Sequence, residues 1–168
     1  MLLRAFITIA LICAIPSAYS YSSGAPEQAC GDMIPQHHVE PQKSDAPYKF
    51  ILNEHQYKAG QSVNFEIKGN AAGDTIKGFL IQARIGDKPV GKFEIPMKSK
   101  KYAQLLNCSG GSGNALTHKK IFGSGQNSII GTWLPPQDVS GEVKLIATIA
   151  LNGGVYWVQK VVTTITIS

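Results

Sequence analysis

From Tyr48 to the C-terminus, apolar and polar residues alternate over short segments that turn residues interrupt. In residues 62–68, Val63, Phe65 and Ile67 lie on one side of the chain, and asparagine, glutamate and lysine lie on the other. Such alternation is typical of a β-strand with one buried face. The same reasoning predicts further strands at 48–52, 76–85, 90–95, 102–106, 129–134, 142–151 and 155–167.

The last two predicted strands are joined by Asn152-Gly153-Gly154, which indicates a hairpin because asparagine and glycine tolerate a positive φ. One face of this hairpin is apolar and includes Trp157. We interpret Trp157 and Trp133 as core residues rather than sugar-stacking residues, because both occupy regularly alternating strands. Tyr156 and Lys160 then lie on the opposite face, which makes them our candidates for ligand contact.

About eight short strands, turns rich in glycine and proline, and no amphipathic helix predict an all-β sandwich. A barrel is the alternative architecture. Residues 115–122 give no clear assignment. Residues 21–47 are rich in proline, glutamine, serine, glutamate and histidine and have no strand or helix period, so we expect an extended N-terminal arm held at Cys30.

Residues 1–20 have the pattern of a secretory signal peptide: Arg4, an apolar run at 5–15, and small residues up to Ser20. The run is about half as long as a bilayer span requires, and a signal anchor is the alternative. We expect cleavage after Ser20 and a secreted, extracellular protein with one domain at 21–168. No later segment has the pattern of a transmembrane helix.

Cys30 and Cys108 are the two cysteines outside the predicted signal. They predict one intramolecular disulfide in an oxidising compartment, with an intermolecular bridge as the alternative. Without a CxxC spacing they make a poor zinc or redox site. Asn107-Cys108-Ser109 also forms an N-glycosylation sequon, and early disulfide formation would compete with modification of Asn107.

After removal of Arg4 with the signal, 15 basic and 11 acidic residues remain, a net charge of +4. This mild charge favours encounter with anionic surfaces such as bacterial envelopes or glycans. The densest basic run is Lys98, Lys100 and Lys101, which we interpret as a solvated loop. No nucleic-acid partner is expected, and we expect a monomer.

No nucleophile elbow, P-loop, zinc-protease helix or dinucleotide fingerprint is present, so we expect no catalytic residues, no cofactor and no enzymatic activity. A disulfide from Cys30 to Cys108 would bring His37 and His38 of the arm toward His118. One arm histidine, His118 and a carboxylate then form a hypothetical metal site. Their spacing matches no established ligand pattern, and we predict no bound metal.

The order of several motifs resembles the reeler domain. The most specific are Lys-Gly-Phe-Leu-Ile-Gln-Ala-Arg at 77–84 and the block 108–118, which ends in Asn-Ala-Leu-Thr-His. The other resembling segments cover nearly all of the predicted mature chain, at 29–37, 46–48, 57–61, 89–93, 104–107, 133–136 and 155–158.

The resemblance implies an immunoglobulin-like β-sandwich in which Cys30 pairs with Cys108. A single reeler domain of this size is similar to the insect proteins named putative defense proteins, which are secreted and immune-induced. That similarity implies an innate-immune role, antimicrobial or microbe-binding, with microbial surface glycans or lipopolysaccharide as partners. The alternative is a structural or developmental protein of matrix, egg or cuticle. We expect no redox role, because the cytochrome domains of reeler-bearing ferric reductases have no counterpart here.

Overall fold

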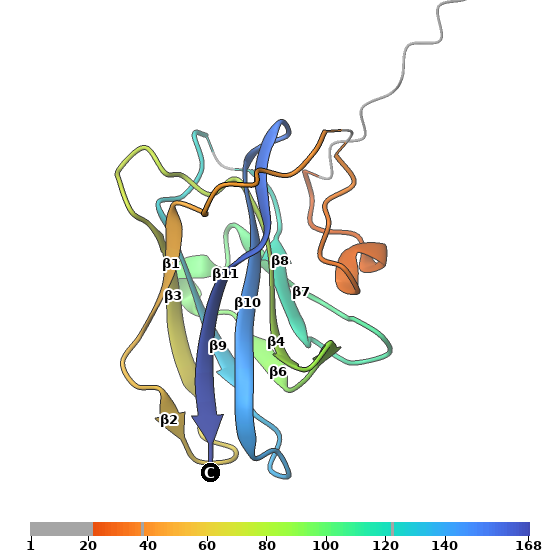
Figure 1. Ribbon diagram of the computed structural model, residues 1–168, viewed down its shortest axis with the longest axis vertical. Coiled ribbons are helices and arrows are strands. Elements are labelled where there is room, and N and C mark those ends of the chain that lie inside the picture. The colour runs from red at the N-terminus through yellow and green to blue at the C-terminus, as the bar shows by residue number, and fades with distance from the viewer. Residues whose placement is uncertain (1–21, 38, 122) are drawn as a thin grey trace, which may run out of the picture.

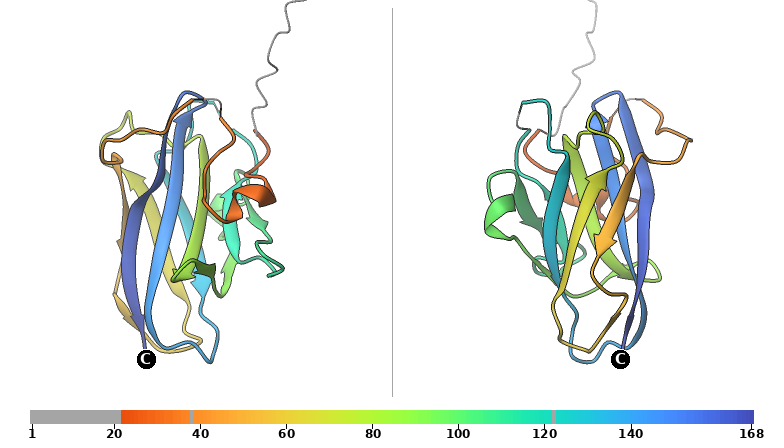
Figure 2. Two further views of the ribbon diagram at one scale, coloured as in Figure 1. Left: turned by 45° about the vertical axis from the view of Figure 1, so that its right-hand side comes forward. Right: turned by 90° about the vertical axis from the view of Figure 1, so that its left-hand side faces the viewer.

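The computed structural model describes residues 22–168 with the exception of 38 and 122. The predicted signal peptide, residues 1–20, lies outside the described residues. Two sheets that are antiparallel except for one short pairing pack face to face, as Figure 1 and Figure 2 show, so the prediction of an all-β sandwich is confirmed and the barrel alternative is wrong.

The smaller sheet has four strands, in the order β1 (Tyr48–Leu52), β3 (Val63–Gly69), β9 (Ser128–Leu134) and β6 (Lys92–Glu94). The larger sheet has seven. Its order is β2 (Gln56–Tyr57), β11 (Val155–Ile167), β10 (Gly141–Asn152), β4 (Gly78–Ile85), β8 (Ala115–His118) and β7 (Ala103–Leu106), with β5 (Lys88–Pro89) paired to β4. The pairing of β2 with β11 is parallel, and the others are antiparallel.

The predicted strands are found with ends displaced by at most two residues. The two-residue strands β2 and β5 were not predicted, and β8 lies in the segment without an assignment. All four residues of β8 are buried, so this strand has no alternation that a sequence pattern can reveal. The Asn152-Gly153-Gly154 hairpin is confirmed, and it joins β10 to β11.

The main core lies between the two sheets. Strand β10 contributes Val143, Leu145, Ala147 and Ile149, each without solvent exposure. Trp133 and Trp157 belong to the same cluster, which confirms that both are core residues. Regular alternation places these side chains on one face, where burial of apolar surface drives the packing of the sheets.

The N-terminal arm covers the other face of the larger sheet, as Figure 2 shows. The arm is extended except for the short 3-10 helix η1 (Glu27–Cys30). Its buried residues Ala29, Cys30 and Met33 form a second cluster with residues of the sheet, among them Leu80 and Ile146. The central strand β4 is therefore buried on both faces, and its burial pattern does not alternate.

Candidate functional site

Tyr156, predicted as an exposed contact residue, is only 1% exposed, so this prediction is wrong. Its hydroxyl donates to the backbone oxygen of Val39, its ring meets His37 edge-on at a centroid distance of 5.1 Å, and its carbonyl accepts from the amide of Gln42 at 2.8 Å. All three partners belong to the arm. Burial raises the pKa of the Tyr156 hydroxyl, with a smaller contribution from the charge of Glu40.

Lys160 is exposed on β11, four residues further along. The strand is not regular between these positions. The pairing of β10 with β11 has a register shift between Ala147 and Ile149, and Gln159 has a φ of 51°. The backbone amide of Gln159 donates to the Thr148 hydroxyl at 3.0 Å. The side-chain amide of Gln159 donates to the backbone oxygen of Asp32. A β-bulge of this kind redirects side chains locally, so simple alternation did not describe this part of the strand.

Cys30 and Cys108 form the predicted intramolecular disulfide, with 5.5 Å between their Cα atoms. The bond ties the arm to the loop between β7 and β8. Asn114 reinforces this loop: its side chain accepts from the Cys108 amide at 2.7 Å and donates to the Cys108 oxygen at 2.9 Å. Asn107 is exposed, and its side-chain oxygen accepts from the Gly113 amide at 2.8 Å. Glycosylation of Asn107 stays a prediction.

Two buried polar side chains of β4 also hold the arm. Gln82 donates to the backbone oxygen of Cys30 at 3.0 Å. Arg84 donates to the oxygens of Cys30 and Gly31 at 2.7 and 2.8 Å and to the Gln82 side chain at 2.6 Å. Burial lowers the pKa of the Arg84 guanidinium, which the charges of Asp87 and Asp32 partly offset. These bonds satisfy backbone carbonyls that the sheet itself cannot pair.

Between the arm and the outer face of the larger sheet lies a pocket of about 70 Å³, which we call the seam pocket. Its wall is largely apolar. The arm contributes one side, and the ends of β4, β8 and β10 contribute the other. The lining residues include Ala29, Met33, Phe79, Leu80, Ile121 and Ala150.

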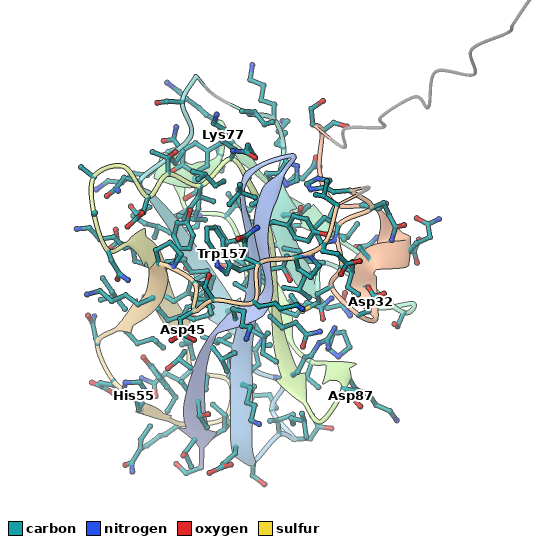
Figure 3. All side chains as sticks on the ribbon, turned by 45° about the horizontal axis from the view of Figure 1, so that its top comes forward. Asp32, Asp45, His55, Lys77, Asp87 and Trp157 are labelled. Atoms are coloured by element: carbon teal, nitrogen blue, oxygen red, sulfur yellow. A yellow bond between two sulfur atoms is a disulfide. The ribbon has the colours of Figure 1, made fainter. Side chains whose placement is uncertain are left out.

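The titratable residues in the lining of the seam pocket are two histidines and a lysine, and the lining contains no carboxylate. His37 comes from the arm, His118 ends β8, and Lys77 precedes β4. Figure 3 shows Lys77 beside the tip of the β10–β11 hairpin, where its amide donates to the Ala150 oxygen at 3.0 Å. Burial lowers the pKa of His37, and the neighbouring His118 lowers it further.

The structure therefore brings an arm histidine to His118, as the hypothetical metal site required. No carboxylate joins them, and the described residues contain no group of three or more side chains able to hold a metal ion. His38 lies outside the described residues. The His118 Nδ1 accepts from the Phe79 amide at 3.3 Å, so this nitrogen takes part in holding β8 against β4.

A second feature is a group of lysines at the start of β7 and the end of β8. Lys98, Lys100 and Lys101 lie in the short helix η2 (Met97–Ser99) and the turn after it. Lys119 and Lys120 follow β8, and the Lys119 amide donates to the Tyr102 oxygen at 2.7 Å. All five lysines, which we call the lysine cluster, are exposed. The antiparallel register of β7 and β8 thus adds two lysines to the run noted in the sequence.

The family model described as "Reeler domain" matches residues 28–168. This chain belongs to the reeler domain family. A protein of Hyphantria cunea named "Putative defense protein Hdd11" is 46% identical over 154 residues, which cover 91% of this chain and 90% of that protein. The "Defense protein l(2)34Fc" of Drosophila melanogaster is 35% identical over 151 residues and covers 89% and 90% of the two chains.

Among solved structures, the human F-spondin reeler domain has a TM-score of 0.61 and 18% identity, covering 83% of this chain and all of that one. At this identity the likeness concerns the fold, and it confirms the predicted reeler architecture. Within residues 22–168, apart from 38 and 122, no helix has the length and apolar character needed to cross a membrane. The disulfide and the defense-protein relatives are consistent with an extracellular protein.

Proposed function

We propose that this reeler protein is a secreted, non-enzymatic defense protein that binds microbial surfaces through the lysine cluster. The observation that carries the proposal is the position of the positive charge. Residues 95–137 contain five lysines and no aspartate or glutamate, and the five lysines are those of the lysine cluster. The remainder of residues 21–168 has ten basic and eleven acidic residues, so the net positive charge comes from this one segment.

Clustering matters because exposed charges are screened over about 8 Å at physiological ionic strength. Lysines scattered over the whole surface act separately under these conditions. The turn before β7 and the end of β8 are adjacent in the sheet, so the residues of the lysine cluster lie close together along the chain's surface, and we expect their ammonium groups to act together. Phosphate and carboxylate groups of microbial envelopes carry the complementary charge.

The names of the relatives favour defense over the structural or developmental alternative. Binding rather than catalysis is supported by the seam pocket, whose titratable side chains are two histidines and a lysine. These three side chains do not supply a nucleophile together with a base and a group that orients the base. An extracellular location fits a buried disulfide, which persists in oxidising compartments.

A pull-down of the oxidised protein on whole bacteria, fungal cells, lipopolysaccharide and β-glucan tests the proposal. We expect saturable binding to at least one of these materials at physiological salt. The variant Lys100→Ser/Lys101→Ser/Lys119→Ser should bind about ten-fold more weakly, since each exposed charge contributes a few tenths of a kcal/mol or more.

The matched control is Lys49→Ser/Lys58→Ser/Lys68→Ser, which removes three exposed lysines outside the lysine cluster and gives the same net charge. It should bind nearly as well as the unmodified protein. An equal loss in both variants would mean that only net charge matters and would contradict a role for the cluster. No binding to any of the materials would contradict microbial recognition and favour the structural or developmental alternative.

A further inference from the structure

Most of the side chains that line the seam pocket are apolar, and the charged group among them is a cation. Its apolar lining comes from both sides, with Ala29 and Met33 on the arm and Phe79, Leu80 and Ala150 on the sheet. Its volume of about 70 Å³ corresponds to about five water-sized groups. A pocket of this size and character accommodates the end of one alkyl chain and is too small for two complete lipid tails.

His37 lines the pocket, and one of its ring nitrogens has no hydrogen-bond partner among the described residues. The Nδ1 atom of His37 is buried and forms no hydrogen bond with any described residue. Leaving a buried nitrogen unpaired is unfavourable, so such atoms in native structures call for an explanation. Because His37 lines the pocket, a rotation of its ring would turn this nitrogen toward a polar atom of a bound ligand.

The charged groups of the lining indicate the sign of the charge that such a ligand would carry. Lys77 is half-buried, with its backbone fixed by the Ala150 oxygen, and it lines the same pocket as His37. A lysine in this position buries its alkyl stem and keeps its ammonium group near water. No carboxylate lines the pocket to neutralise this charge. The arrangement is complementary to an anion attached to an apolar chain.

We propose that the seam pocket binds a single-chain amphiphile with an anionic headgroup. The end of the alkyl chain fills the space between the arm and β4, and the headgroup lies beside Lys77 and His37. The lysine cluster is a different set of residues, so this inference does not depend on the proposed binding to microbial surfaces.

The direct test is a titration of the oxidised protein with decanoate, followed residue by residue through backbone amide signals in NMR spectra. We expect saturable shifts centred on 77–80 and 148–153. Decanol, with the same chain and no charge, should bind more weakly, as should decyltrimethylammonium with the opposite charge. Acetate, which has the headgroup without the chain, should give no saturable shifts.

Two variants fill the pocket. Ala150→Leu adds three carbon atoms to its wall and should weaken decanoate binding roughly fifty-fold, the effect of excluding about three methylene groups. Gly78→Ala is a milder change, whose added Cβ would lie 3.3 Å from the Ala150 Cβ and 3.6 Å from the His118 Cε1. Gly78→Ala should also weaken decanoate binding, though by less, and it keeps the test valid if Ala150→Leu does not fold. Ala72→Leu, at an exposed turn, is the control and should bind normally.

The headgroup contact is tested with Lys77→Gln, which should weaken decanoate binding about five-fold or less, the range of a partly exposed ion pair. Lys49→Gln makes the same charge change on the other sheet and should have no effect. Equal affinity for decanol and decanoate would overturn the assignment of an anionic headgroup. The whole proposal would be overturned by shifts centred away from the pocket, or by binding to phosphatidylglycerol vesicles without binding to decanoate.

Discussion

The two faces of the seven-stranded sheet are covered in different ways. The inner face packs against a second sheet through residues such as Leu145 and Ile149, which have no exposure to solvent. The outer face is covered by the arm, a single segment with little regular structure. Strand β10 contributes to both, because its alternate residues Ile146, Thr148 and Ala150 point toward the arm or the seam pocket.

The interactions on the two faces differ in kind. The inner face relies on apolar burial, which has no direction and tolerates no gaps. The outer face relies on the disulfide and on directional bonds, such as the donation from the Thr148 hydroxyl to the Met33 oxygen at 2.8 Å and those from Gln82 and Arg84. Directional bonds position the arm without requiring contact everywhere. The seam pocket is therefore found on this face.

The largest expected effect compares two isoleucines of β10. Ile149→Ala, on the inner face, should lower the free energy of unfolding by about 4 kcal/mol, because it leaves a cavity in a closely packed core. Ile146→Ala, on the outer face and 8% exposed, should cost about 2 kcal/mol, since the arm can settle toward the gap. Urea denaturation of both variants measures the difference. Equal costs would show that the two faces are packed alike.

The second effect concerns the covalent link. Replacing Cys30 and Cys108 together by alanine should lower the free energy of unfolding by about 3 kcal/mol, because the unfolded chain loses its cross-link across 78 residues. Limited proteolysis should then cut the arm first while the sandwich persists. The unmodified protein treated with a reductant is the control and should be cut at the same places. First cleavage within the sandwich strands would contradict the separation of the two faces.

The smallest effect concerns a polar anchor of the arm. Arg84→Met keeps most of the buried alkyl volume but removes the donors to Cys30 and Gly31, so the free energy of unfolding should fall by about 2 kcal/mol. Lys144→Met is the matched control, since Lys144 pairs with Arg84 across the strands but is exposed, and it should change stability little. Hydrogen exchange should show faster opening at 29–33 in Arg84→Met alone. Faster exchange throughout the chain would instead indicate a global role for Arg84.

A strand with one covered and one solvated face shows an alternation that can be read directly from the sequence. β3 is such a strand, and its alternation of Val63, Phe65 and Ile67 with polar residues is preserved in the burial pattern. β2 and β5, with two residues each, were too short to predict. β8 and Tyr156 were missed for another reason, since both are buried by contacts that are remote in sequence. The polar partners of the arm, Gln82 and Arg84, were missed for the same reason, because their types alone predict solvent exposure.

The sequence by itself determined most of the strands, the β10–β11 hairpin and the apolar face of the regularly alternating strands, and it allowed one intramolecular disulfide pairing. These features depend on residues close together in the chain or on a count, and both can be read without a structure. Only the tertiary structure decided that the arm covers the outer face, that His37 meets His118 and Lys77 in one pocket, and that five lysines gather where β7 and β8 pair. The physical reason is that alternation specifies which side of a strand is apolar, whereas the segment that covers the other side depends on long-range contacts.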